Sequence, residues 1–272
     1  MPELPEVETI RRGLELHLAG RRLTAVQVLT PKLRRPVPKG FLQALVGLLL
    51  VRVRRRSKYL LLEMEQEWSL VIHLGMSGRL LLETDADAAT KHTHLILEFE
   101  GLSLVFRDPR RFGFVEVVKQ REIAEMEPFA SLGPEPLSDA FTAEYCLASM
   151  RGLRQSVKAW LMDQRRVAGI GNIYANEALF RAGILPQRPA GTLTAGEIER
   201  LAASVKSILQ QAVELGGTTL SDFVNSEGDP GYFQNHLEVY QRAGKPCSRC
   251  GGIIEKSVTA GRSTFFCSTC QK

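Results

Sequence analysis

The start of the chain, MPELPEVE, contains residues that could act as a nucleophile and an acid. Once the initiator methionine is removed, Pro2 carries a free secondary amine. An α-amino group has a pKa of about 7.7–8.0, against about 10.4 for lysine, so a substantial fraction of it is neutral near pH 7. Such an amine can attack a sugar C1′ and form an iminium directly, while Glu3 beside it could protonate a leaving oxygen or shuttle protons.

The same stretch can also be explained as the beginning of a helix. A proline and glutamates in the first turn suit the positive end of a helix, and apolar residues recur at helical spacing from Val7 towards Gly20. Helix initiation accounts for Pro5 and Glu6 but leaves Pro2 unexplained. From these residues alone, both explanations stay open.

Four cysteines near the end of the chain form a metal-binding pattern. Cys247 and Cys250, then Cys267 and Cys270, make two CxxC pairs separated by sixteen residues. Two such pairs supply a closed tetrahedral shell of thiolates, so the pattern predicts one structural Zn²⁺ without an open position for catalysis. A pair of redox dithiols is the alternative. Cys146, alone in a helical pattern, is expected to be a buried apolar residue.

Two basic segments could contact an anion. Between the CxxC pairs, Arg262 lies at an expected turn, where a metal-clamped arginine would suit a phosphate; the alternative is a solvated turn residue. The second segment is a strand whose alternate residues should share one face: Arg52, Arg54, Arg56 and Lys58. Four such charges repel one another unless an anion compensates them. A solvated edge strand guarded by charge is the alternative.

Three glycine-containing turns could also reach a partner. DPRRFG places Phe112 beside arginines, and HLGMSG sets Met76 between glycines, so either side chain could act as a wedge in a base step. Ordinary packing is the alternative for both. In AGIGN, glycines precede a helix that is expected to begin at Ile173 with Asn172 as a polar cap, and the free backbone N–H groups there could receive a phosphate.

The order of segments predicts an α+β chain. After the first helix, segments rich in Val, Leu, Ile and Phe run from about residue 23 to residue 118, which predicts an antiparallel sandwich or barrel. A stretch rich in proline and acids between residues 121 and 139 marks a boundary, and helical periodicity follows before the cysteines. We therefore expect domains at residues 1–130, 131–236 and 237–272.

Composition and charge limit the class of protein. With 44% hydrophobic and 24% charged residues, the chain is typical of a soluble globular protein. A net charge of +5 and a pI near 9.0 fit a polyanionic partner without proving one. No apolar run approaches the ~20 residues of a membrane span, and the start lacks a signal peptide, so we expect a cytoplasmic protein and no membrane partner. Nothing in the sequence suggests more than a monomer.

Taken together, these segments resemble one family. The similarity covers PELPEVE, RSKYLLLE, HLGMSGRL, DPRRFG, GIGNIYANEALF, GGTTLSDF, GYFQNHLEVYQR, GRSTFFC and the four cysteines, in order and over nearly the whole chain. The family is bacterial formamidopyrimidine-DNA glycosylase, a repair enzyme for oxidised purines that is also an AP lyase. It implies an N-terminal helix and β-sandwich, a helical domain with a helix-two-turns-helix element, and a zinc β-ribbon. The implied partner is duplex DNA with oxidised bases or abasic sites, bound at the nucleoid.

The resemblance also implies catalytic roles. Pro2 corresponds to the nucleophile and Glu3 to the catalytic acid, with Glu6 in the same constellation. Lys58 matches a lysine near the scissile phosphate and the base. Arg262 completes this group from the zinc hairpin.

Other residues match contacts to DNA. Arg262 and Asn172 match the residues that grip the phosphates flanking the lesion. The residues matching those inserted into the duplex are Met76, Arg110 and Phe112, and those resembling further backbone contacts are His92 and Lys158. The stretch from Gly216 to Tyr232 looks like the loop that closes over an everted base.

The implied reaction begins with attack of Pro2 on C1′, which expels the base, and continues with β,δ-elimination of the 3′ and 5′ phosphates. Two alternatives are kept. The related endonuclease VIII branch acts on oxidised pyrimidines and begins with a PEGP pattern, whereas Leu4 stands here. A non-catalytic DNA-bending zinc protein would have no reason to keep Pro2 with Glu3.

Overall fold

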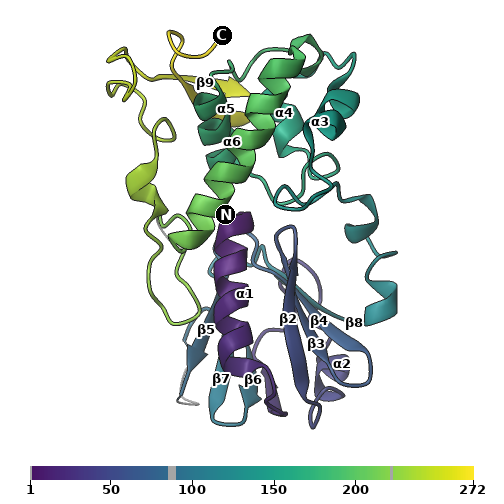
Figure 1. The fold of residues 1–272 in the computed structure, drawn as a ribbon. Coiled ribbons are helices and arrows are strands. Elements are labelled where there is room, and N and C mark those ends of the chain that lie inside the picture. The colour runs from purple at the N-terminus through teal and green to yellow at the C-terminus, as the bar shows by residue number, and fades with distance from the viewer. Residues whose placement is uncertain (1, 85–89, 221–222) are drawn as a thin grey trace. The chain divides into compact units, whose positions relative to one another are not determined.

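The computed structural model describes residues 2–84, 90–220 and 223–272 (Figure 1). Contacts divide the chain into two compact units. The first unit comprises Met1–Ala130 and Leu215–Gln234, and the second comprises Ser131–Glu214 and Asn235–Lys272. The segment Leu215–Gln234, placed by the sequence in the helical domain, therefore packs with the N-terminal unit. The division into three domains stays a prediction.

The first unit begins with α1 (Leu4–Leu18). Its apolar residues recur every three or four positions, and this face is buried in the core of the unit: Val7, Ile10, Leu14 and Leu18. Glu3 is the N-cap and forms a capping box with Glu6. In Figure 1, α1 lies beside β2, with which it makes contacts.

Two four-stranded antiparallel sheets follow, which confirms the predicted β-sandwich. The first sheet has the order β1 (Leu23–Val28), β6 (Thr93–Phe99), β7 (Leu102–Arg107) and β5 (Arg79–Glu83). The second has the order β2 (Leu50–Arg56), β3 (Tyr59–Met64), β4 (Trp68–His73) and β8 (Phe114–Lys119). Apolar side chains from α1 and both sheets form one hydrophobic core. The connections contain α2 (Lys39–Gln43) and the 3₁₀ turns η1 (Gln120–Glu122) and η2 (Phe129–Ser131).

The second unit is helical and ends in a β-hairpin. Its helices are α3 (Ala143–Met150), α4 (Val157–Met162), α5 (Asn172–Ala182) and α6 (Ala195–Glu214), with η3 (Ala190–Thr192) before α6 and η4 (Phe233–His236) after it. The hairpin is β9 (Glu255–Thr259) and β10 (Arg262–Phe266). Helix α6 starts with a capping box, in which the Thr194 N–H donates to Glu197 at 2.8 Å.

Among the helices that the structure describes, none is both long enough and apolar enough to cross a lipid bilayer.

Candidate functional site

The predicted nucleophile and acid lie at the buried beginning of α1. Pro2 and Glu3 are both buried, and Glu3 is 3% exposed. Glu6 fixes this end of the chain, because its Oε2 accepts the backbone N–H of Glu3 at 2.8 Å. Glu3 is thus the N-cap of α1, and in the capping box its side chain accepts the backbone N–H of Glu6. Removal of Met1 falls on a residue outside the described ranges.

Glu6 also connects the start of α1 to the segment after α6. Its Oε1 accepts the backbone N–H of Thr218 at 2.8 Å, and both residues are buried. Gly217 permits this approach: its φ is +83°, and a Cβ there would lie 3.1 Å from the Glu6 side chain. The predicted base-covering loop, Gly216–Tyr232, therefore begins against the proposed catalytic end. Residues 221 and 222 of that loop lie outside the described residues.

Lys58 differs from the sequence expectation of one continuous basic face. Strand β2 ends at Arg56, and Ser57 takes a φ of +55°, which breaks the alternation. Lys58 is therefore turned out of the row and is 6% exposed. Burial of an ammonium group costs free energy unless the charge is compensated. The buried position of Lys58 therefore favours a specific role over membership of an exposed basic surface.

Two arginines of the basic strand, Arg52 and Arg54, have an anionic partner within the sheet. Glu63 of β3 stands opposite Arg52 in the antiparallel register and forms ion pairs with both Arg52 and Arg54. Its side chain is 5% exposed, whereas those of the two arginines are 55% and 57% exposed. A carboxylate of the protein itself therefore compensates two of the four charges on this row.

The two predicted wedge turns are packed against each other. Met76 and Phe112 are 39% and 43% exposed, and a Cβ on Gly75 would meet the Phe112 backbone carbon at 2.4 Å. The guanidinium of Arg110 lies 4.8 Å from the centre of the Phe112 ring. The structure therefore brings Met76, Arg110 and Phe112 to one exposed cluster in the first unit.

Asp108 holds this cluster together and was not identified from the sequence. It is fully buried, and it accepts the Ser77 hydroxyl at 2.6 Å and the Gly113 N–H at 2.8 Å. The Arg110 N–H also donates to it, at 3.2 Å. An aspartate before proline in a turn is the signal that could have found it, because such side chains commonly accept backbone N–H groups nearby.

His73 is a second residue that the sequence analysis missed. Burial, followed by the charges of Lys58, Arg34 and Arg35, lowers the pKa of His73 to about 4. Its Nδ1 accepts the Gly75 N–H at 3.1 Å, so the ring proton resides on Nε2. The imidazole is thus a neutral donor next to Lys58. His92, predicted to contact DNA, is exposed just before β6 and does not belong to this group.

In the second unit, the predicted phosphate-binding residues meet at the hairpin. Arg262 is exposed at the start of β10, after a turn in which Ala260 and Gly261 have φ of 50° and 70°. Asn172 is the first residue of α5, and its side-chain amide donates to the Ser263 carbonyl at 3.0 Å. The structure therefore places Asn172 next to the strand that carries Arg262.

Lys158 was predicted to contact the DNA backbone, and that role stays a prediction. It is fully buried, and its ammonium donates to the Ser263 carbonyl and to Thr264 Oγ1, each at 2.8 Å. The physical reason is that α4 packs behind the hairpin, where β10 offers oxygen acceptors. Lys158 is a support for the segment that carries Arg262.

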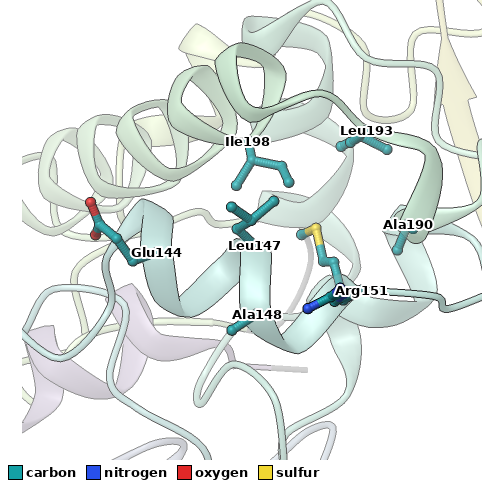
Figure 2. A pocket seen from close by; sticks show the side chains of 9 residues that line it. Glu144, Leu147, Ala148, Arg151, Ala190, Leu193 and Ile198 are labelled. Carbon is teal, nitrogen blue, oxygen red and sulfur yellow. The ribbon is translucent and has the colours of Figure 1, made fainter.

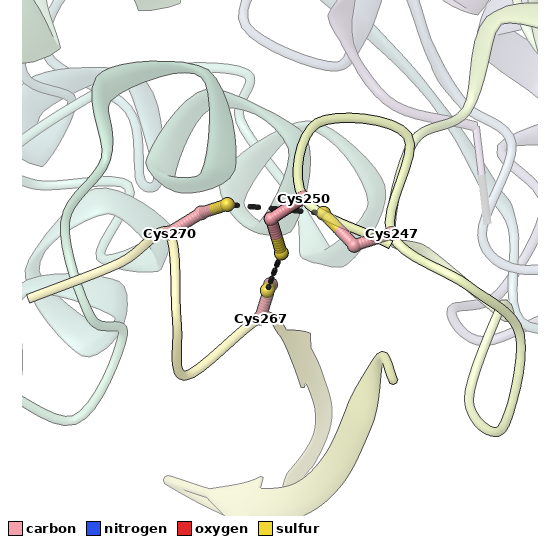
Figure 3. A group of neighbouring side chains, drawn as sticks. All are labelled: Cys247, Cys250, Cys267 and Cys270. Atoms are coloured by element: carbon pink, nitrogen blue, oxygen red, sulfur yellow. Dashed lines mark hydrogen bonds between the residues drawn. The ribbon is translucent and has the colours of Figure 1, made fainter. Parts of the chain in front are cut away.

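The four predicted zinc ligands come together (Figure 3). All four Sγ atoms lie within 4.8 Å of one another, with Cys247 to Cys270 at 3.9 Å and Cys250 to Cys267 at 3.5 Å. A tetrahedron with Zn–S bonds of about 2.3 Å has edges of about 3.8 Å, so the thiolates fit one Zn²⁺. The set is closed, and the site is structural. Cys146 lies elsewhere, buried as predicted, and burial raises its pKa to about 12.

Helix α5 anchors the zinc ribbon through residues that the sequence did not reveal. The buried carboxylate of Glu177 accepts the backbone N–H groups of residues 238, 239 and 240 at 2.7–3.0 Å. Asn176 accepts the Phe265 N–H at 2.8 Å, and Arg249 donates to the Phe180 carbonyl at 3.1 Å. These contacts make the ribbon and α5 one packed element.

A cavity of about 420 Å³ lies among α3, η3 and α6 (Figure 2). Apart from Glu144 and Arg151, its lining is mostly apolar. None of the predicted catalytic, DNA-contacting or zinc residues lines it. We assign it no role.

The comparisons with known proteins cover the whole chain. Residues 1–115 match the formamidopyrimidine-DNA glycosylase N-terminal domain, residues 132–224 its H2TH domain, and residues 244–272 the zinc finger found in FPG and IleRS. The chain is 48% identical to formamidopyrimidine-DNA glycosylase of Paracoccus denitrificans and 50% identical to that of Yersinia enterocolitica, with both chains fully covered in each case.

Solved structures agree with the sequence comparisons. A Lactococcus lactis FPG mutant in complex with DNA containing Fapy-dG matches with a TM-score of 0.93 at 35% identity, over 100% of both chains. The MutM (FPG) protein of Thermus thermophilus matches with a TM-score of 0.89 at 44% identity, over 99% of this chain and 98% of that one.

Proposed function

Since the chain belongs to the formamidopyrimidine-DNA glycosylase family, we propose that Pro2 is the nucleophile with which it excises oxidised purines from duplex DNA. The chain is a DNA repair glycosylase with AP lyase activity. The observation that supports the proposal is the buried beginning of α1, where Glu6 accepts the backbone N–H of Glu3, the residue that follows Pro2.

The chemistry follows from an amine that needs little activation. The neutral nitrogen of Pro2 attacks C1′, the glycosidic bond breaks, and the departing base takes the proton that the nitrogen loses. A proton delivered to O4′ then lets the C1′–O4′ bond break, which opens the sugar ring and leaves an iminium between Pro2 and C1′. The iminium acidifies the C2′ protons, so loss of one proton expels the 3′ phosphate and a second elimination expels the 5′ phosphate. Glu3, the next residue after Pro2, serves as acid and proton carrier. Lys58, buried between β2 and β3, supplies a positive charge for a phosphate or for the base.

Binding divides between the two units. In the first, Met76, Arg110 and Phe112 form the exposed cluster suited to fill the gap left by an everted nucleotide, whose unstacking costs a few kcal/mol. In the second, Arg262 and Asn172 are the phosphate ligands, and His92 adds a surface contact. Because phosphates dominate such binding, affinity falls steeply with salt. The zinc would hold the hairpin, and with it Arg262, and takes no part in the chemistry.

Borohydride trapping tests the nucleophile. Reduction in the presence of a duplex with 8-oxoguanine should yield a covalent complex through Pro2. Pro2→Gly should sharply reduce strand cleavage, and two extra residues ahead of Pro2, which turn the amine into an amide, should abolish both trapping and cleavage while binding persists. If the unmodified protein binds the duplex yet releases no base and cannot be trapped, the DNA-bending alternative replaces this proposal.

The lesion class needs its own assay. A structure of the Lactococcus lactis enzyme with DNA containing an oxidised pyrimidine also matches this chain, with a TM-score of 0.92 at 35% identity. We propose that purines are preferred, on the grounds of Leu4 and the DPRRFG turn. The rates of cleavage of duplexes that contain 8-oxoguanine or thymine glycol, measured in parallel, decide between the two lesion classes. Faster cleavage of the thymine glycol duplex would assign the chain to the pyrimidine branch.

A further inference from the structure

We propose that the outer face of β2 and β3 is a binding site for an acidic peptide segment of a partner protein that also carries an apolar side chain. The face is hollowed by a cavity of about 380 Å³. It is lined by the basic strand, by β3 and by the segment that follows β8: Arg52, Arg54, Arg56, Leu61, Glu63, Gln120, Ile123, Ala124, Phe129 and Ala130.

The charge of this lining selects an anionic partner. The charged residues of the lining are three arginines and Glu63, so its formal charge is positive, and Glu63 pairs with Arg52 and Arg54. Glu63 is buried and already shared between Arg52 and Arg54, which leaves most of each guanidinium exposed to a ligand. Because a guanidinium offers five donors, an arginine bound to one carboxylate on one side can bind a second on another.

Part of the cavity lining is apolar, which favours a peptide over a nucleic acid backbone. Leu61 and Phe129, which line the cavity, are 4% and 8% exposed, and Ile123 of the lining is half-buried. Phosphates and sugars gain little from such a surface, whereas a leucine or phenylalanine side chain flanked by carboxylates would bury its apolar area there.

The peptide would be held by side chains, because the backbone of β2 is already engaged. Although β2 is the edge strand of its sheet, Glu15 of α1 accepts the Val53 N–H, and Arg11 donates to the Val53 carbonyl at 3.4 Å. Pairing of an added strand along this edge would require α1 to move. None of the residues that we assign to catalysis, DNA contact or zinc lines the cavity.

A binding assay with matched peptides tests the proposal. The probe is the end-blocked hexapeptide DDLFDD, labelled with a fluorophore, and binding to the full-length protein is followed by anisotropy at low and high salt. The control peptides are NNLFNN, which lacks the charges, and DDSSDD, which lacks the apolar side chains. We expect each control to bind at least about tenfold more weakly than DDLFDD, and salt to weaken DDLFDD binding. Equal binding of all three, or none by DDLFDD, overturns the proposal.

Two variants locate the site. Ile123→Asp adds a negative charge to the cavity lining and leaves the pairs of Glu63 intact, so it should weaken DDLFDD binding about tenfold while base excision is unchanged. Arg54→Gln should weaken DDLFDD binding about threefold. The matched control is Arg200→Gln on the exposed side of α6, which should have no effect. If Ile123→Asp instead lowers affinity for an undamaged duplex and leaves peptide binding unchanged, the face belongs to nucleic acid and the proposal is wrong.

Discussion

Glu6 accepts the backbone N–H of Thr218, which lies 212 residues further along the chain, through Oε1 at 2.8 Å. Its other oxygen accepts the N–H of Glu3. One buried carboxylate therefore joins the beginning of α1 to the start of the loop proposed to cover an everted base. The position of the nucleophile and the position of that loop depend on the same side chain.

Replacement of Glu6 by glutamine should break one of these two contacts. The amide has one acceptor oxygen, and its NH₂ group would face an N–H donor, so a buried donor loses its partner at a cost of about 1–3 kcal/mol. We expect a lower free energy of unfolding and slower base release, measured by denaturant titration and single-turnover kinetics. Glu199→Gln, on the exposed face of α6, is the control and should change neither. An unchanged rate of base release would show that the junction does not position the chemistry.

Lys158→Met distinguishes a support from a phosphate contact. Loss of the ammonium removes its hydrogen bonds to Ser263 and Thr264, so the hairpin should loosen and affinity for lesion-containing duplex should fall about tenfold. The slope of log affinity against log salt should stay the same, because no phosphate contact is lost. Arg262→Met should reduce the magnitude of that slope by about 0.9, the value for one phosphate. A reduced slope for Lys158→Met would restore its role as a DNA contact.

Removal of one zinc ligand should release the metal and disrupt the ribbon. Cys247 is buried in a small hydrophobic cluster with Phe180, Val239 and Phe265, so Cys247→Ser should also lower the thermal stability of the second unit and weaken DNA binding. Elemental analysis should find about one zinc per chain in the unaltered protein. Cys146→Ser, also at a buried cysteine, should retain the metal. Unaltered protein without zinc would contradict the assignment.

His73 should make the protein less stable in mild acid. Its pKa is about 4 in the folded chain, against 6.5 for the free side chain, so the folded state favours the neutral ring. The contribution of about 3 kcal/mol is fully present above pH 6.5 and is lost as pH falls from 6.5 through about 4. In His73→Asn, this part of the pH dependence of unfolding should be absent. His17→Asn, at a more exposed histidine, is the control, and identical pH profiles for the unaltered protein and His73→Asn would refute the assignment.

Local patterns in the sequence were sufficient to predict the first helix, the strands of the sandwich and the zinc site. The apolar residues from Val7 to Leu18 recur at helical spacing, and this face of α1 is buried. Alternation of apolar and polar residues predicts the strands of the sandwich. The two CxxC pairs specify a closed shell of four thiolates. These features depend on neighbours within a few residues, or on ligand chemistry that tolerates little variation in spacing. For the same reason the resemblance to one family could be recognised from short motifs.

Tertiary structure alone decided which charged side chains face solvent and which support others. The sequence could not show that Lys58 leaves the row of Arg52, Arg54 and Arg56, because a single positive φ at Ser57 reverses the expected direction. It could not show that Lys158 is buried behind the hairpin, or that Glu6 contacts Thr218, because these contacts join segments about a hundred residues apart or more. Burial and long-range pairing are properties of the packed chain, and the identity of a lysine or glutamate does not specify its environment.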